Sequence, residues 1–184
     1  MGNEFGHPEW IDFPREGNGW SFHYCRRQWN LLENGYLKYQ WLGDFDRDMI
    51  HLAKEHEIFK QKMADQLLLK DPEKVLCFYR NGLVFVFNFH PSQSLTNVLV
   101  PFWDDSDFEL VMSSDDVKYG GQGLVEHMKY ESKVFDEKNF VELYIPARTA
   151  MVFKVVPKPV KEEVKKAEKK APAKKAAAKK KAEK

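Results

Sequence analysis

Three carboxylates near the start of the chain, Glu4, Glu9 and Asp12, are the first residues whose chemistry suits catalysis. Two carboxyl groups can work as nucleophile and proton donor when one is ionised, the other is protonated and both are held rigidly, about 5–5.5 Å apart. Residues 1–20, however, contain four glycines and two prolines, which break any regular period and predict an irregular loop. A loop of this kind does not fix carboxylates, so we expect no catalytic residue in this chain.

Metal and thiol chemistry is not indicated either. His23 and Cys25 are two residues apart and would face different sides of a helix, which makes them a poor pair of metal ligands. Cys25 and Cys77 are the only cysteines, and neither lies in a CxxC or Cys/His spacing. We therefore expect no metal site, no cofactor, no disulfide and two buried, reduced thiols.

Two helices are expected after the loop. The first runs from Ser21 to a C-cap at Asn34-Gly35. The second runs from about Tyr36 to Phe59, and its apolar residues recur every three or four positions, which keeps them on one face. This apolar stripe consists of Leu37, Trp41, Phe45, Met49 and Leu52.

After residue 72 the period changes to that of strands. Asn81-Gly82 lies between two β-rich runs, which is the strongest short-range signal of a hairpin. Seven short strands separated by turn residues favour an antiparallel β-sandwich. The expected strands cover residues 75–79, 83–89, 95–100, 108–112, 124–130, 140–145 and 149–156.

The charge is divided unevenly along the chain. Residues 157–184 contain 12 Lys and 4 Glu, a net charge of +8, so the preceding 156 residues carry −7 of the total of +1. No aromatic residue lies beyond Phe153, so this segment has almost nothing to bury and is predicted to be a disordered tail. The tail can attract polyanions non-specifically through counterion release, although a merely solubilising role is the simpler interpretation.

The chain has no apolar run of about 18 residues, so no membrane span is expected. Its first residues also lack the basic and then apolar pattern of a secretory signal. We expect a soluble, cytoplasmic protein.

Several segments carry a family resemblance. MGNEFGHPEW at 1–10 is followed by SFHY at 21–24 and RRQW at 26–29, and FDRDM at 45–49 lies in the second expected helix. Together with the later segments, they resemble the end of the catalytic barrel and the C-terminal all-β domain of 1,4-α-glucan branching enzymes in the α-amylase superfamily. The later segments are VFVFNFHP at 84–91, SDD at 114–116, YGG at 119–121 and IPARTA at 145–150.

The resemblance implies an α+β organisation in three parts. Residues 1–70 would be the terminal loop and helices of a (β/α)₈ barrel, residues 71–156 the β-sandwich and residues 157–184 the tail. A complete barrel takes about 250 residues, and the family's catalytic carboxylates belong to earlier motifs that have no match here. Because Met1 coincides with a methionine of the family motif, we expect a truncated reading frame or an excised fragment, with a split-gene subunit as the alternative.

The resemblance also implies a position for four N-terminal residues. Asn3, Glu4, His7 and Trp10 would lie at the rim of the active cleft, where polar groups and an aromatic face can meet sugar hydroxyls and CH groups. Trp10 is equally well explained as an anchor that packs on the barrel. Arg26-Arg27 would pair with acidic groups of the barrel or, as we favour, form a solvated helix face.

The function implied by the resemblance is a share in glycogen biosynthesis. The complete enzyme cleaves an α-1,4 bond and transfers the glucan to form an α-1,6 branch. This chain would provide scaffold and cleft rim, with the missing N-terminal barrel portion as partner and α-glucan or glycogen as substrate of the full enzyme. The alternative is a stand-alone interaction module whose β domain binds polysaccharide or whose tail binds polyanions.

Overall fold

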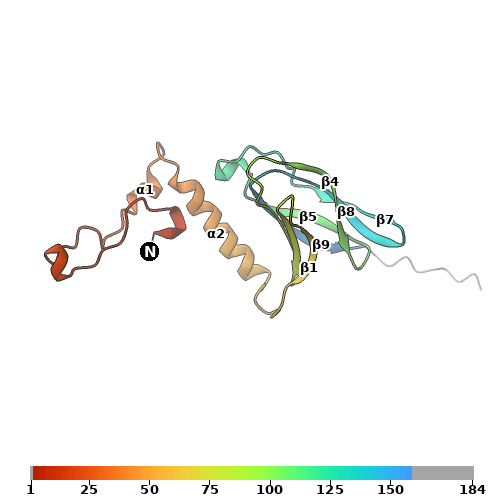
Figure 1. Ribbon diagram of the computed structural model, residues 1–184, viewed down its shortest axis with the longest axis horizontal. Coiled ribbons are helices and arrows are strands. Elements are labelled where there is room, and N and C mark those ends of the chain that lie inside the picture. Colours follow the sequence, from red (N-terminus) through yellow and green to blue (C-terminus); the bar gives the residue numbers. More distant parts are fainter. Residues whose placement is uncertain (1, 159–184) are drawn as a thin grey trace, which may run out of the picture.

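The computed structural model describes residues 2–158, and the predicted tail lies outside these residues except for Pro157 and Lys158. An irregular N-terminal segment leads into one long helix, which lies beside an antiparallel β domain (Figure 1). The helical elements are η1 (Asn3–Phe5), η2 (Glu16–Asn18), α1 (Asn30–Glu33), α2 (Tyr39–Glu55) and η3 (Val117–Tyr119). The strands are β1 (Asp65–Lys70), β2 (Val75–Arg80), β3 (Leu83–Asn88), β4 (Leu95–Phe102), β5 (Ser106–Ser113), β6 (Lys129–Tyr130), β7 (Ser132–Phe135), β8 (Lys138–Ile145) and β9 (Thr149–Pro157).

Two sheets form the β domain. The larger sheet has the strand order β1-β2-β3-β9-β5-β6 and the smaller one β4-β8-β7, and every pairing is antiparallel. The α+β class with an antiparallel sandwich, predicted from the sequence, is confirmed. The last strand, β9, does not add to an edge: it lies between β3 and β5 and is paired along both sides.

The Asn81-Gly82 hairpin is confirmed as well. Arg80 pairs directly with Leu83, so the loop has two residues, and both have positive φ, 45° at Asn81 and 84° at Gly82. This is the backbone of a type I′ turn, whose twist matches that of the two strands it joins.

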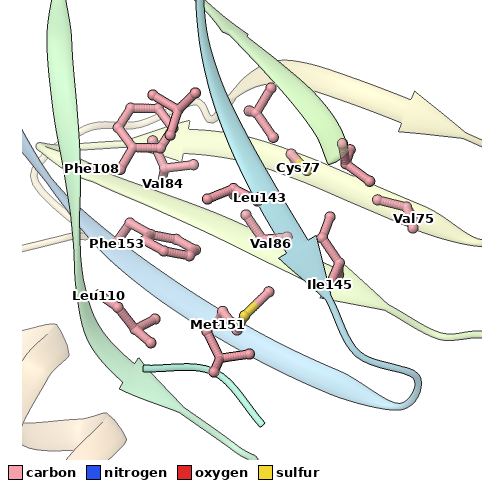
Figure 2. Packing of buried hydrophobic residues seen from close by; sticks show 14 of the residues in the cluster. Val75, Cys77, Val84, Val86, Phe108, Leu110, Leu143, Ile145, Met151 and Phe153 are labelled. Carbon is pink, nitrogen blue, oxygen red and sulfur yellow. The ribbon is translucent and has the colours of Figure 1, made fainter. Parts of the chain in front are cut away.

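Strand alternation decides which side chains form the core (Figure 2). Val84 and Val86 on β3, with Met151 and Phe153 on β9, point between the sheets and are fully buried, and β8 closes the core from the other sheet with Leu143. Fully burying a side chain of this size contributes about 1.5–3 kcal/mol. The residues between them, such as Phe85 and Val152, are left on the outer face of the larger sheet.

Helix α2 covers that outer face. Phe45, Met49 and Leu52 of the predicted stripe line an apolar cavity of about 280 Å³ between helix and sheet. The sheet contributes Leu83, Phe85, Phe87, Met112, Ala150 and Val152 to this cavity. The stripe is therefore covered largely by the β domain of the same chain.

The first expected helix is mostly wrong. Of residues 21–34, only Asn30–Glu33 form a helix, because earlier backbone groups have other partners. The Gln28 N–H, which a helix would direct at the Tyr24 carbonyl, instead donates to His7 Nε2 at 3.1 Å. The Tyr24 carbonyl accepts from the Asp12 N–H and from the Arg27 guanidinium. Contacts with the preceding loop thus replace the helical hydrogen bonds.

Three details of the strand pattern also differ. The sheet begins at Asp65, because β1 pairs with β2, whereas the change of period in the sequence falls after residue 72. Strand β7 was not expected, and of the expected strand 124–130 only Lys129–Tyr130 pairs. The start of that expected strand does not pair, because the Asp115 carboxylate accepts the N–H groups of Gln122 and Leu124, at 3.0 and 2.6 Å.

The end of β9 is held by a buried carboxylate. Asp107 is 2% exposed and accepts the Ser132 N–H at 2.9 Å. Its oxygens also lie 3.0 Å from Lys129 Nζ and 3.2 Å from Lys158 Nζ. Burial alone would raise the pKa of Asp107, but the Ser132 amide and the two ammonium groups outweigh it, so this pKa lies below its ordinary value of 3.8. The first two residues of the expected tail, Pro157 and Lys158, are thus part of the fold.

Asp107→Asn should lower the free energy of unfolding at pH 7 by about 1–3 kcal/mol, because it removes a carboxylate held by an amide and two ammonium groups. A group whose pKa is lowered in the folded state stabilises fully above its unfolded pKa. This stabilisation is lost as the pH falls below 3.8. Urea unfolding at pH 7 and pH 3 should show that the difference in free energy of unfolding between the unsubstituted chain and Asp107→Asn is smaller at pH 3. Glu131→Gln, at an exposed position, is the control, and a gap that does not change with pH would contradict this account.

Candidate functional site

The N-terminal segment is attached to α2 through Phe5. Its ring is 1% exposed and lies 5.3 Å from the Trp29 ring and 6.4 Å from the Tyr39 ring, centroid to centroid. The turn η1 that carries Phe5 is flanked by Gly2 and Gly6, both in the left-handed conformation. This turn fixes where the four predicted rim residues lie.

Two of the four, His7 and Trp10, are joined by one guanidinium group. Arg27 Nη1 lies 2.9 Å from His7 Nδ1 and donates to the Glu9 carbonyl at 3.0 Å, while Nη2 donates to the Trp10 carbonyl at 3.2 Å and to the Tyr24 carbonyl at 2.6 Å. The His7 ring is fixed from its other side by the Gln28 N–H. The Trp10 ring is 65% exposed, with Tyr24 at a centroid distance of 5.6 Å.

The other two lie differently. The Asn3 side chain is exposed, whereas Glu4 is half-buried and lines a hollow of about 440 Å³ on the side of α2. This hollow also involves Leu32, Gln40, Gly43, Asp44, Asp46, Arg47, Ile50 and His51. The structure thus connects His7 with Trp10 through Arg27 and places Glu4 beside the helix.

Arg27 is the residue of this region that the sequence analysis misjudged. The favoured interpretation was a solvated helix face, but the side chain reaches four acceptors in the loop and in the turn before α1. The error has the same origin as the missing helix, since both follow from the loop lying against residues 24–28. The local sequence pattern of residues 21–34 does not indicate that contact.

One of the three N-terminal carboxylates, that of Asp12, has structural partners. Asp12 accepts from Arg15 Nε at 2.9 Å and from Asn18 Nδ2 at 3.0 Å, and these hydrogen bonds hold the pKa of Asp12 below its usual range. A proton donor for glycoside chemistry needs the opposite shift. The backbone of Glu9, not its carboxylate, is what binds Arg27 and His7. Asp12 therefore fixes the shape of the loop.

A second cluster joins α2 to the β domain. The Tyr119 hydroxyl donates to Asp48 Oδ2 at 2.7 Å, and Lys118 Nζ lies 3.1 Å from the same oxygen. The Tyr119 hydrogen bond and the neighbouring ammonium group hold the pKa of Asp48 below its ordinary value. The Tyr119 ring also meets Phe45 edge to face, at 5.2 Å. The YGG segment thus lies at the contact between helix and sheet.

Gly120 completes this contact. It has φ 76°, and a Cβ atom there would lie 2.3 Å from Trp41 Cε3, so the indole ring packs directly on the glycine backbone. The Gly-Gly segment follows the turn η3 in the long loop between β5 and β6. Its role is to let α2 approach closely.

The family segments converge on this end of the β domain. A polar hollow of about 600 Å³ is lined by residues of the HPSQS, SDD, YGG and IPART stretches, which are far apart in the sequence. Ser92, Gln122 and the exposed Arg148 provide polar groups there. Each of these segments alone is a weak indication of the family, but in the structure they lie together, beside the contact with α2.

Residues 2–158 provide no site for metal or thiol chemistry. They contain no group of three or more His, Cys, Asp or Glu side chains arranged to hold a metal ion. Cys77 is buried in the core, and burial raises the pKa of its thiol to about 12, so it stays protonated. Cys25, expected to be buried, is only half-buried. No helix in the described part of the chain is long and apolar enough to cross a membrane.

The comparison with known proteins agrees with this geometry. Residues 69–156 match the family described as "Alpha amylase, C-terminal all-beta domain", which defines the class of the sandwich. A 1,4-alpha-glucan-branching enzyme of Yarrowia lipolytica is 43% identical over 83% of this chain and 23% of its own length. Those of Debaryomyces hansenii and Equus caballus are 41% and 40% identical, each over 86% of this chain, and over 24% and 23% of their lengths.

The chain therefore belongs to the 1,4-alpha-glucan-branching enzyme family, and it corresponds to the C-terminal region of these proteins. The resemblance seen in the sequence is confirmed. The chain spans only about a quarter of the length of the relatives it matches.

The contact between Trp41 and Gly120 provides a test of how α2 is held. Gly120→Ala and Gly82→Ala both force an L-residue into the left-handed region, at about 1 kcal/mol each, but only the first also drives a methyl group into a ring. We expect Gly120→Ala to cost about 1–3 kcal/mol more, as overpacking does. Urea unfolding measures the difference. Amide exchange should be faster in the first half of α2, residues 39–47, for Gly120→Ala alone, because Gly82 belongs to the hairpin that contacts the other end of the helix. Equal effects of the two substitutions would show that α2 does not rest on Gly120.

Proposed function

We propose that this chain supplies the C-terminal all-β domain and the last barrel helix of a 1,4-α-glucan-branching enzyme, with residues 1–64 completing the barrel and the β domain, which begins at Asp65, supporting them. The observation that carries the proposal is that α2 is fixed to the sheet along one side only. Its stripe meets the β domain, while Leu42 and Ile50 remain exposed on other sides of the helix.

The exposed apolar surface supports a missing partner. Large contiguous apolar patches are rare on soluble monomers and mark interaction surfaces. The N-terminal segment, α2 and the connection from α2 to β1 expose many large apolar side chains, and the N-terminal segment follows an extended path (Figure 1). They are Trp10, Ile11, Phe13, Trp20, Phe22, Tyr24, Trp29, Tyr36, Leu42, Ile50, Phe59 and Met63. The remaining barrel of a branching enzyme would cover them.

The proposed reaction is cleavage of an α-1,4 bond and transfer of the glucan to form an α-1,6 branch. It proceeds through a covalent glycosyl-enzyme intermediate, for which a nucleophilic carboxylate and a proton donor are required. In our proposal both groups come from other barrel strands. Asn3, Glu4, His7 and Trp10 form part of the cleft rim, and the rigid attachment of His7 and the open face of Trp10 suit that role.

Reconstitution tests this function. The chain alone should leave amylose unbranched, as judged by the iodine spectrum and the chain-length profile after debranching. Mixing it with the Yarrowia lipolytica relative from which the matching region has been removed should restore branching. Branching by the chain alone, lost on Asp12→Asn, would overturn the scaffold role.

The rim residues can be tested in the same reconstituted enzyme. Trp10→Ala should lower kcat/KM for amylose about tenfold, which corresponds to about 1.4 kcal/mol of transition-state stabilisation. Trp20→Ala, at another exposed indole of the loop, is the control and should change it little. If Trp10→Ala weakens assembly and leaves kcat/KM of the assembled enzyme unchanged, Trp10 is an anchor and not a rim residue.

The basic tail supports a further, non-specific interaction with polyanions, which rests on its net charge of +8. Removing residues 159–184 should abolish low-salt binding to heparin and leave the melting temperature nearly unchanged. Removing residues 157–184 should also lower the melting temperature, because it deletes Pro157 and the ion pairs of Lys158 with Asp105 and Asp107. Heparin binding that survives both deletions would place the site in the folded body.

A further inference from the structure

The side chain of Arg27 holds the path of the N-terminal loop. Its two terminal nitrogens bind one ring nitrogen and three backbone carbonyls, which belong to His7, Glu9, Trp10 and Tyr24. The remaining donor, Nε, is buried and has no partner among residues 2–158. Because most of the acceptors are carbonyls and none is a carboxylate, Arg27 fixes backbone here and does not neutralise an acid.

Of the two proposed rim residues that Arg27 joins, only one is free to meet a substrate. Nδ1 of His7 faces Arg27 Nη1 and the Glu9 N–H, and its Nε2 faces the Gln28 N–H. Neither nitrogen is left for a sugar hydroxyl, whichever of them carries the ring proton. The Trp10 ring, by contrast, is 65% exposed, while its backbone carbonyl is held by Arg27. Trp10 is therefore the residue through which Arg27 can affect a substrate.

The neighbour of the Trp10 ring is fixed by the same nitrogen. Arg27 Nη2 donates both to the Trp10 carbonyl and to the Tyr24 carbonyl. The two aromatic rings lie 5.6 Å apart, centroid to centroid, with 55° between their planes. The Tyr24 carbonyl also accepts the Asp12 N–H. One nitrogen atom thus joins two backbone segments and sets how the two rings lie against each other.

This arrangement requires a guanidinium group. Its N–H donors point in fixed directions from a planar fork, whereas a lysine carries a compact ammonium group on a flexible stem. Lysine at position 27 would keep the charge but could not span acceptors on two sides. The preceding Arg26 is exposed and makes none of these bonds. Arg26 therefore provides a matched control of equal charge.

We propose that Arg27 is a positioning residue of the branching reaction, which touches no substrate and holds Trp10 in the orientation in which its indole ring meets the glucan chain. The proposal rests on the proposed function, since the reaction and the rim position of Trp10 belong to it. A residue that contacts substrate is effective only when surrounding bonds fix its position. Arg27 thus acts on substrate binding, and it does so through Trp10.

Steady-state kinetics of the reconstituted enzyme, with rates expressed per mole of chain, test this role. Arg27→Met keeps an apolar stem and removes the fork. It should raise KM for amylose about tenfold, as Trp10→Ala does, and change kcat less than about twofold, because lost uniform binding changes KM alone. The double variant should have the KM of Trp10→Ala, since the two residues act as one unit. Arg27→Lys should recover only part of the loss, and Arg26→Met should change neither constant.

Three results would overturn the proposal. If the effects of Arg27→Met and Trp10→Ala on KM multiply in the double variant, Arg27 does not act through Trp10. A fall in kcat with an unchanged KM would show a merely structural role, which reduces only the amount of active enzyme. Full recovery by Arg27→Lys would show that positive charge is sufficient and that the fork is not needed.

Amide exchange of the chain alone separates this proposal from the proposed function. Arg27→Met should lower the protection factor of the Gln28 amide, which donates to His7, and leave residues 39–55 unchanged. No change in Arg27→Met, or an equal change in Arg26→Met, would overturn the positioning role. If reconstitution yields no branching while Arg27→Met alone loosens the loop, the proposed function falls and the role of Arg27 in holding the loop stands.

Discussion

The close approach of α2 to the larger sheet is the contact on which the arrangement of this chain depends. Trp41 packs on the bare backbone of Gly120, and Asp48 accepts the Tyr119 hydroxyl. Because the N-terminal segment is attached to α2 through Phe5, the position of the whole segment relative to the β domain is decided there. The buried core of the sandwich supplies most of the stability, but this smaller contact determines where residues 2–38 point.

The second end of the helix is fixed by the hairpin. Asn81 Nδ2 donates to the carbonyls of His56 and Glu57, at 2.8 and 3.1 Å, and its backbone N–H donates to the Gln61 side chain. Helix α2 ends at Glu55, so these bonds hold the turn that follows it. The same Asn-Gly dipeptide that reverses the chain between β2 and β3 thus also fixes the exit from α2. One turn serves two elements that are far apart in the sequence.

Much of this fold was predictable because its signals are local. Alternating β-branched and aromatic residues indicate strands, Asn81-Gly82 indicates a hairpin, and the three- and four-residue spacing of Phe45, Met49 and Leu52 indicates a helix face. What failed depends on contacts between distant segments. The helix expected at residues 21–34 is replaced by hydrogen bonds to His7 and Asp12, and Asp115 draws residues 122–124 out of strand pairing. The four proposed rim residues were suggested only by the family resemblance, since their spacing alone shows no chemistry. The contacts of Arg27 had no signal in the sequence.

The central position of β9 has a consequence for how the domain is made. This strand is the last one among residues 2–158, yet it lies between β3 and β5 and contributes Met151 and Phe153 to the core. Before β9 has been synthesised, β3 and β5 therefore each have an unpaired edge, and the core is incomplete. Such edges are templates for association with other chains. Synthesis of the domain thus passes through a vulnerable interval that ends only when its final strand is inserted, and the need for chaperones should be greatest during that interval.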